Sequence, residues 1–247
     1  MMRAAVITIF PGLVREFLGY GLIKRAVESG ALEVAVADLR DHAHDKHRSV
    51  DDTPFGGGAG MVMRPEPLFE AVEAHRRTGD RVILLSPQGA LLTHDKAAAL
   101  GRQPGLVLIS GRYEGVDERV RTALVDEEIS IGDYVLMGGE LPALVLLEAI
   151  ARLLPGVVGN RDSIAQDSFA AGLLDHPQFT RPAEFRGVKA PEVLLSGNHE
   201  EIARWRRREA LRQTLQKRPD LLSRARLSAD DMVSLDHIKQ HLTSLVA

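Results

Sequence analysis

The sequence has no cysteine among its 247 residues, and this absence excludes several classes of site. Without a thiol the chain can form neither a disulfide framework nor a thiolate zinc site, and it has no cysteine nucleophile. Long apolar runs are also missing, since the longest, at residues 141–150, contains Pro142 and Glu148. A membrane-spanning helix needs about 20 apolar residues, so we expect no membrane segment.

The N-terminus lacks the features of a secretory signal. Residues 1–10 are apolar, but this run is too short for a signal peptide. Pro11 and Gly12 end it without a small-residue cleavage pattern. We therefore expect a cytoplasmic protein.

The composition is that of a globular protein with unevenly placed charge. Hydrophobic residues make up 45% of the chain and charged residues 26%, far from the low hydrophobicity of disordered chains. The formal net charge is -3, yet residues 199–226 contain nine Lys or Arg against four acids. The chain as a whole is not a basic nucleic-acid coat, but its C-terminal part is locally basic.

Short β-rich runs alternate with longer helical patterns through the first 155 residues. Val, Ile and Leu dominate four nearly continuous runs, as expected for strands buried on both faces of a parallel sheet, at residues 4–10, 32–39, 81–86 and 105–110. Apolar residues recur at helical spacing in residues 13–28, 65–77 and 94–100, the last with Thr93 as its N-cap. The alternation predicts an α/β fold with a parallel sheet.

A small, polar stretch precedes a second, helical region. One helix is predicted at about residues 200–217, with four apolar side chains facing inward: Ile202, Trp205, Leu211 and Leu215. A chain of this length fits one core of about 150 residues plus a small appendage. We therefore expect an α/β domain over residues 1–159, a linker over residues 160–175 and a helical domain over residues 176–247.

Residues 41–64 interrupt the alternation with a polar segment that is long for a loop in a compact domain. Its glycine run at residues 56–60 matches neither common phosphate-loop pattern. The run therefore favours a mobile loop with glycine hinges over a phosphate cradle, although glycines do let backbone N–H groups approach an anion.

The same segment contains a cluster that approaches the spacing of a metallo-β-lactamase zinc site: His42, His44, Asp45 and His47. Lys46 stands where the metal-binding carboxylate belongs. A solvated polar loop is the favoured interpretation, and a metal-dependent hydrolase is kept as a rival.

Two glycine-containing turns are placed to bind a ligand. Residues 109–119 follow a predicted buried strand and open a helix, and residues 131–142 form a second such loop, in which Pro142 suits a first helical turn. Ligands in open α/β sheets bind outside the carboxyl ends of strands. For the first turn, a simple β-to-α connection with Glu114 and Asp117 near the positive end of a helix explains the pattern equally well.

Two charged residues have a structural explanation beside a chemical one. Arg152, near the end of the helix that follows the second turn, would complement the helix dipole. Asp167 would cap a short helix. Local sequence does not decide between these roles and catalysis.

Short motifs are spread along nearly the whole chain. They are VDDTPFGGG at residues 50–58, LSPQG at 85–89, GRYEG at 111–115, SIGDYVLMGGELP at 130–142, DSF at 167–169, LLD at 173–175, TRP at 180–182 and LSGNH at 195–199. Together, and in this order, they resemble the bacterial tRNA (guanine-N1)-methyltransferases of the trefoil-knot SPOUT superfamily.

This resemblance implies a knotted α/β domain, an exception to the rule against threaded chains, and a homodimer. It also implies that S-adenosylmethionine binds to the knot loops. The residues that match the family's cofactor site are Leu85, Ser86, Pro87, Gly111, Ile131, Gly132, Asp133, Tyr134, Val135, Leu136, Gly138, Gly139 and Pro142.

The substrate implied is the guanosine immediately 3′ of the anticodon, at tRNA position 37. Its N1 carries a proton that must leave, and Asp167 matches the family's general base, a role worth about 10²- to 10⁴-fold in rate. Negative charge that develops on guanine O6 needs electrostatic stabilisation, for which Arg152 is the candidate, with Glu114 in support. The family's Mg²⁺ requirement would serve the same end.

The resemblance implies that tRNA lies across the N-terminal domain of one subunit and the C-terminal domain of the other. Asp51 and Asp52 would read guanine edges. The other residues implied to contact tRNA are Asp175, Ser196, Asn198, Arg206, Arg207 and Arg208, the arginines through phosphates.

Two positions depart from the common family pattern. Phe55 stands where Tyr is usual, and residues 176–179, HPQF, replace a typical CPHY. Neither is a proposed catalytic position, although both bear on tRNA contact. The alternative function is a catalytically silent RNA-binding module on the same fold.

Overall fold

A computed structural model describes residues 1–159, 164 and 167–244 of the protein. The chain divides into two compact units, Met1–Gly159 and Asn160–Ala247. Within the described ranges, we find no helix with the length and apolar character needed to cross a bilayer.

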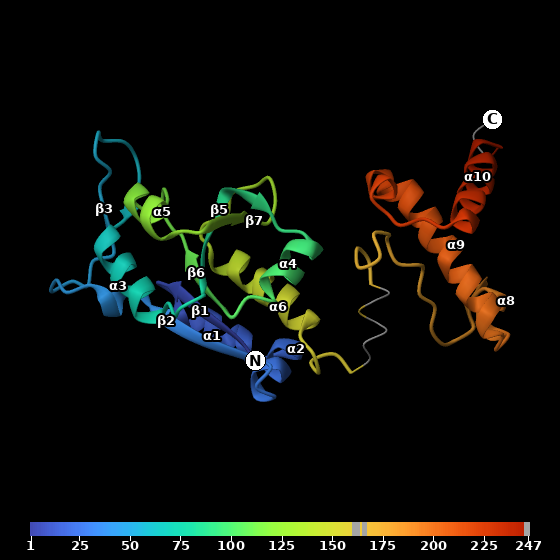
Figure 1. Ribbon diagram of the computed structural model, residues 1–247, viewed down its shortest axis with the longest axis horizontal. Coiled ribbons are helices and arrows are strands. Elements are labelled where there is room, and N and C mark those ends of the chain that lie inside the picture. The colour runs from blue at the N-terminus through green and yellow to red at the C-terminus, as the bar shows by residue number, and fades with distance from the viewer. Residues whose placement is uncertain (160–163, 165–166, 245–247) are drawn as a thin grey trace. The chain divides into compact units, whose positions relative to one another are not determined.

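A five-stranded parallel sheet forms the centre of the first unit (Figure 1). In chain order its strands are β1 (Met2–Thr8), β2 (Leu32–Asp38), β5 (Arg81–Leu91), β6 (Gly105–Ser110) and β7 (Glu127–Ser130). In the sheet they lie in the order β2-β1-β6-β5-β7, and each neighbouring pair is parallel. The prediction of a parallel α/β sheet is confirmed, and only β7, which begins with two glutamates, was not among the predicted strands.

Helices cover both faces of the sheet and create two cores. The helices α1 (Pro11–Leu18), α2 (Gly21–Glu28), α4 (His94–Leu100) and α6 (Glu140–Leu153) pack on the face that includes Leu106 and Leu108. On the other face, α3 (Pro65–His75) and α5 (Glu118–Leu124) pack against Val107 and Ile109. Because successive strand residues point to opposite faces, burial on both faces explains the unbroken apolar runs.

The helical segments were predicted with one error. Residues 13–28 form two helices, because the chain turns at Gly19 and Tyr20 and Gly21 adopts a φ of +59°, which interrupts a continuous helix. At α4 the prediction is confirmed, since the Thr93 hydroxyl accepts a hydrogen bond of 3.2 Å from the Lys96 N–H.

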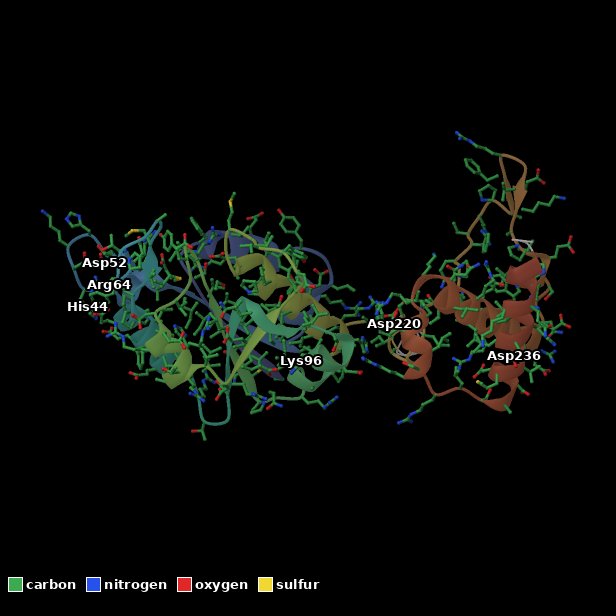
Figure 2. All side chains as sticks on the ribbon, turned by 90° about the horizontal axis from the view of Figure 1, so that it is seen from above. His44, Asp52, Arg64, Lys96, Asp220 and Asp236 are labelled. Carbon is green, nitrogen blue, oxygen red and sulfur yellow. The ribbon has the colours of Figure 1, made fainter. Side chains whose placement is uncertain are left out.

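The polar segment at residues 41–64 lies outside the main sheet. It begins within the 3₁₀ helix η1 (Leu39–His42) and contains an antiparallel pair, β3 (Asp51–Asp52) and β4 (Val62–Met63). His44, Asp52 and Arg64 gather at one end of the unit, far from Lys96 on α4 (Figure 2). The glycine run forms an exposed loop between the two short strands.

The second unit is mainly helical. It contains the hairpin strands β8 (Glu184–Phe185) and β9 (Val188–Lys189), α8 (Glu192–Leu195), α9 (His199–Lys217), η2 (Pro219–Ser223) and α10 (Ala229–Ser244). Its core consists of Leu173, Leu211, Leu235 and Ile238. The helix predicted at residues 200–217 is confirmed as α9.

Part of the segment predicted as a linker packs within this unit. Leu173 is buried in the core, and the Leu174 N–H donates a 2.9 Å hydrogen bond to the Thr214 hydroxyl. Asp167 lies in a turn in which its carbonyl accepts from the Ala170 N–H at 3.1 Å. Residues 160–163 and 165–166 of the predicted linker lie outside the described residues.

Candidate active site

A cavity of about 230 Å³ lies in the first unit at the carboxyl ends of β6 and β7 and beside the irregular middle of β5. Its lining comprises residues 84–88, 111–116, 129–132 and 134–139, together with Arg121 and Pro142. Parallel α/β sheets bind their ligands at this edge, because the loops that leave the strands diverge there.

The cofactor residues predicted from the sequence converge on this cavity. All of them except Asp133 belong to its lining. Gln88, Arg112 and Tyr113 line it too and were not predicted, although each lies inside a recognised motif. Arg121 had no such signal, because it lies on α5, outside the motifs.

Gly139 allows two backbone segments to meet beside the cavity. Its N–H donates a 2.8 Å hydrogen bond to the Gly111 carbonyl. A Cβ atom at Gly139 would lie 2.7 Å from the Cα atom of Ser110. Since this contact is with backbone, a larger residue would push the two turns apart, and the glycine is required for their close approach.

A buried carboxylate holds one wall of the cavity. Glu140, only 1% exposed, accepts hydrogen bonds from the Thr8 hydroxyl at 2.7 Å and from Arg112 Nε at 2.9 Å. The Arg112 guanidinium also lies 4.4 Å from the centre of the Phe10 ring, a cation–π contact. The paired charges offset each other's desolvation and fix Arg112 between the β6 turn and the start of α6.

The cavity lining also contains a polar pair. Arg121 Nη1 donates a 2.8 Å hydrogen bond to the Gln88 side-chain oxygen. The Gln88 N–H donates to the Ser86 hydroxyl at 3.1 Å. These contacts connect α5 to residues 86–88 of β5, so two chain segments that are distant in sequence share one polar network.

The segment that carries β4 pairs with the first glycine turn. The Glu114 N–H donates to the Met61 carbonyl and the Met63 N–H to the Gly115 carbonyl, both at 2.9 Å. This pairing places Glu114, a predicted catalytic residue, in the cavity lining next to the glycine loop.

Tyr113 connects the cavity to one of the predicted substrate residues. Its hydroxyl hydrogen-bonds to the Asp51 carboxylate, and burial, followed by the charge of Asp51, raises the pKa of Tyr113. Tyr113 is therefore a neutral hydrogen-bond donor near neutral pH. Asp52 is exposed, and its carboxylate accepts a hydrogen bond from the Thr53 N–H at 2.8 Å.

A second pocket, of about 380 Å³, lies within the C-terminal unit. Its lining brings together four predicted residues, Asp167, Asp175, Arg206 and Arg207. The Asp175 N–H donates to the Ser168 hydroxyl at 2.9 Å, which ties the two acidic motifs together. His176 and His199 also line this pocket and were not predicted as site residues.

The three consecutive arginines of α9 differ in their surroundings. Arg206 and Arg208 are exposed, whereas Arg207 pairs with the buried Asp231 through Nε at 2.9 Å and a terminal nitrogen at 2.8 Å. The hydrogen bond from Arg207 lowers the pKa of Asp231 to about 2. Since successive helical residues point about 100° apart, the three side chains do not share one face.

Two other predicted substrate residues stabilise the start of α9. The Asn198 side-chain oxygen accepts from the Glu201 N–H at 3.3 Å, as an N-cap. The Ser196 hydroxyl accepts from the Asn198 N–H at 3.1 Å. Both side chains therefore have a local structural role, whatever else they contact.

The predicted catalytic residues belong to different units. Glu114 and Arg152 are in the first unit, and Asp167 is in the second. Arg152 lies exposed in the last turn of α6, where a cation complements the helix dipole, and it is not part of the cavity lining.

The histidine-rich cluster has partners in its own segment and on α3. His44 Nε2 lies 2.7 Å from Glu70 Oε2, and the Asp45 carboxylate accepts from the N–H groups of His47 and Ser49. In the part of the chain that the structure describes, no group of three or more His, Asp or Glu side chains could hold a metal ion. These contacts favour the polar-loop interpretation over the zinc-hydrolase rival.

Comparison with known proteins gives one consistent result. A family model described as tRNA (Guanine-1)-methyltransferase TrmD matches residues 2–224. A protein named tRNA (guanine-N(1)-)-methyltransferase from Moorella thermoacetica is 56% identical over 243 residues, 97% of each chain. Proteins of the same name from Dictyoglomus turgidum and Pelotomaculum thermopropionicum are 50% and 51% identical, over 98% and 99% of each chain.

Proposed function

The chain belongs to the tRNA (guanine-1)-methyltransferase family, and we propose that it transfers a methyl group from S-adenosylmethionine to N1 of guanosine 37 in tRNA. The product is N1-methylguanosine. The match along residues 2–224 carries this proposal. The names of the relatives specify tRNA and the guanine nitrogen; the donor and the position in tRNA follow from the motifs that resemble the family's site.

The cavity beside β5 and at the carboxyl ends of β6 and β7 is the proposed site for S-adenosylmethionine. Its lining suits an amphipathic ligand, because Leu85, Ile131 and Leu136 supply apolar surface while Ser86 and Gln88 supply hydrogen-bonding groups. Glycine turns expose further backbone donors and acceptors there. When bound, the cofactor supplies an electrophilic methyl group.

Asp167 is the proposed general base. The guanine N1–H proton would pass to its carboxylate, and the nitrogen electron pair would form the new N–CH₃ bond as the sulfur–methyl bond breaks, with that bond's electron pair remaining on sulfur and S-adenosylhomocysteine leaving. Its place in the C-terminal pocket beside Arg206 and Asp175 supports contact with a polar base. Charge that develops on guanine O6 needs a partner, and Arg152, with Glu114 in support, is the proposed source.

A homodimer is proposed to complete the site, with the first unit of one subunit facing the second unit of the other. Apolar side chains at the starts of two packed helices support it. Phe10 and Leu13 at α1, and Met137 and Leu141 at α6, are all more than two-fifths exposed. Clustered exposed apolar residues of this kind mark association surfaces.

A trefoil knot in the first unit is also proposed. Backbone contacts among the three segments around the cavity support it. The Leu92 N–H donates to the Ser130 carbonyl at 2.8 Å, and two separate parts of β5 pair with β7. The Gly139-to-Gly111 hydrogen bond joins the third segment to this assembly.

The proposed tRNA contacts include the exposed charged side chains of α9. Arg206 and Arg208, which are exposed, are proposed to contact phosphates, while Arg207 would reach RNA only beside its partner Asp231. Asp51 and Asp52 are proposed to contact guanine edges, and Asp175, Ser196 and Asn198 to contact the RNA beside α9.

Mg²⁺ commonly uses one or two carboxylates plus substrate oxygens, and Glu114 is the carboxylate of the cavity lining.

The decisive test supplies labelled S-adenosylmethionine and two tRNA transcripts that differ only at position 37. We expect label to enter the transcript with guanosine 37 and not the one with adenosine 37. Transfer to both transcripts, or to neither, would contradict the proposed substrate.

Asp167→Asn separates catalysis from binding. Loss of the general base should lower the rate of transfer by about 10²- to 10⁴-fold, while the dissociation constant for tRNA changes little. A wild-type protein that binds tRNA but transfers no methyl group would instead be a silent RNA-binding module.

A further inference from the structure

The β8–β9 hairpin of the C-terminal unit has no role in the proposed chemistry. Glu184 pairs with Lys189 and Phe185 with Val188, and the Ala190 N–H closes the hairpin on the Ala183 carbonyl at 2.8 Å. In Figure 2 the hairpin, drawn as the tan strands, projects away from the helices of its unit.

The hairpin exposes apolar side chains that a folded protein normally covers. Phe185 is 62% exposed and Val188 is 70% exposed. Each residue from 181 to 189 is exposed. An isolated two-stranded hairpin is marginally stable, and an aromatic ring in water forgoes the stabilisation that its burial would supply. This exposed surface therefore suits a partner.

The hairpin is basic, and one cation is held on the aromatic ring. Arg181, Arg186 and Lys189 outnumber the single acid, Glu184, which lies 4.0 Å from Lys189. The Arg186 guanidinium lies 5.2 Å from the centre of the Phe185 ring, within cation–π distance.

Arg186, the residue that carries that cation, has a strained backbone conformation in the turn. Arg186 and Gly187 have φ values of +52° and +79°, as in the turns that best match the twist of a two-stranded hairpin. The left-handed conformation costs a residue other than glycine about 1 kcal/mol. Glycine or asparagine would adopt it more easily, so arginine here is better explained by a contact than by the turn.

The segment that leads into the hairpin contacts the main helix of its unit. The rings of His176 and Phe179 meet Trp205 of α9 edge-on, with centroids 6.1 Å and 6.3 Å apart. Pro191, just past the hairpin, precedes the first turn of α8. The exposed tip is therefore carried on a packed support rather than on a free chain end.

We propose that this hairpin binds an unpaired nucleotide of the tRNA. The base stacks on the Phe185 ring, and Arg181, Arg186 and Lys189 contact the neighbouring phosphates. An exposed aromatic ring beside several cations is the chemistry by which proteins hold single-stranded RNA. A protein partner is disfavoured because nearly all of the charge around the ring is positive. This inference rests on the proposed tRNA substrate.

The test compares Phe185→Leu with Phe185→Trp in the full chain. Leucine keeps an apolar side chain but removes the stacking surface. We therefore expect the dissociation constant for tRNA to rise by roughly 5- to 100-fold. The KM for tRNA should rise while the KM for S-adenosylmethionine and the thermal midpoint stay unchanged. Tryptophan should restore affinity. Unchanged tRNA affinity in the leucine variant overturns the proposal.

Arg186→Asn is the matched change at the turn, since asparagine tolerates the left-handed conformation. It should weaken tRNA binding and reduce the slope of log affinity against log salt by about 0.7 to 0.9. An unaltered slope removes Arg186 from the phosphate contacts and contradicts the proposal.

Two further measurements distinguish failure of this proposal from failure of the proposed function. If Phe185→Leu converts a dimer to a monomer in sedimentation, the hairpin is a subunit contact and the proposal is wrong. If the wild-type protein binds tRNA but does not methylate guanosine 37, the proposed function fails while the comparison of tRNA affinities still decides the role of the hairpin.

Discussion

Glu140 illustrates how one residue both stabilises the fold and shapes the site. Its carboxylate is almost fully buried, and its two oxygens accept from Thr8 and Arg112, which come from β1 and the β6 turn. A buried charge of this kind is tolerated only when its partners compensate its desolvation. The same pair positions the Arg112 side chain in the cavity wall.

Glu140→Gln should therefore lower the free energy of unfolding by about 3 kcal/mol, the lower part of the range for breaking a buried pair, because Arg112 is left uncompensated. It should also weaken S-adenosylmethionine binding. Urea unfolding and calorimetric titration measure the two effects. Glu148→Gln, on the exposed side of the same helix, is the control, expected within about 0.5 kcal/mol of wild type. Equal stabilities of the two variants would show that the pair is not needed.

At the scale of elements, α9 combines a structural face and an exposed face. Arg207 pairs with Asp231, whose carboxylate also accepts from the Ser228 N–H at 2.8 Å at the start of α10. The pair therefore joins the two long helices of the unit. Arg206 and Arg208, on either side, are left for solvent or RNA.

This pair should make the packing of α9 on α10 sensitive to acid. The pKa of Asp231 is lowered from 3.8 to about 2, so its stabilising effect is complete above about pH 4 and is lost as the pH falls through 2. The amount is on the order of 2 kcal/mol. Denaturant unfolding followed by fluorescence of Trp205, the single tryptophan, reports on this unit directly.

Arg207→Met should be less stable at pH 7 and should lose less stability between pH 4 and pH 2 than wild type. Arg208→Met, which removes an exposed charge from the same helix, should keep the wild-type acid response. The interpretation is wrong if the two variants respond to acid alike.

At the scale of the whole molecule, the proposed catalytic residues are divided between two units. Arg152 and Glu114 belong to one, and Asp167 belongs to the other. An active site shared between subunits would bring the first unit of one chain to the second unit of its partner, so two differently damaged chains could form one intact site.

Purified heterodimers of Asp167→Ala and Arg152→Ala chains test this arrangement. Each homodimer should be nearly inactive, whereas the heterodimer should recover roughly half of wild-type activity, because one of its two sites carries neither change. Separate affinity tags on the two chains allow its isolation. A heterodimer as inactive as its parents would place the complete site within a single chain.

The sequence alone determined the parts of this protein that depend on local burial and local hydrogen bonding. Unbroken apolar runs located four of the five strands, because strands buried on both faces need no polar alternation. Thr93 marked the start of α4 for a similarly local reason. The motifs that resemble the family also located most of the cavity lining.

Only the tertiary structure decided which distant side chains meet. Glu140 and Thr8 are 132 positions apart, and Arg207 and Asp231 lie on different helices, so no local pattern reports their contact. Arg207 looks the same in sequence as its neighbours Arg206 and Arg208, yet it alone of the three is held by a buried carboxylate. Periodicity shows which side of each segment faces the core. The pairing of charges depends on which distant segments the fold brings together, and only the tertiary structure decides that.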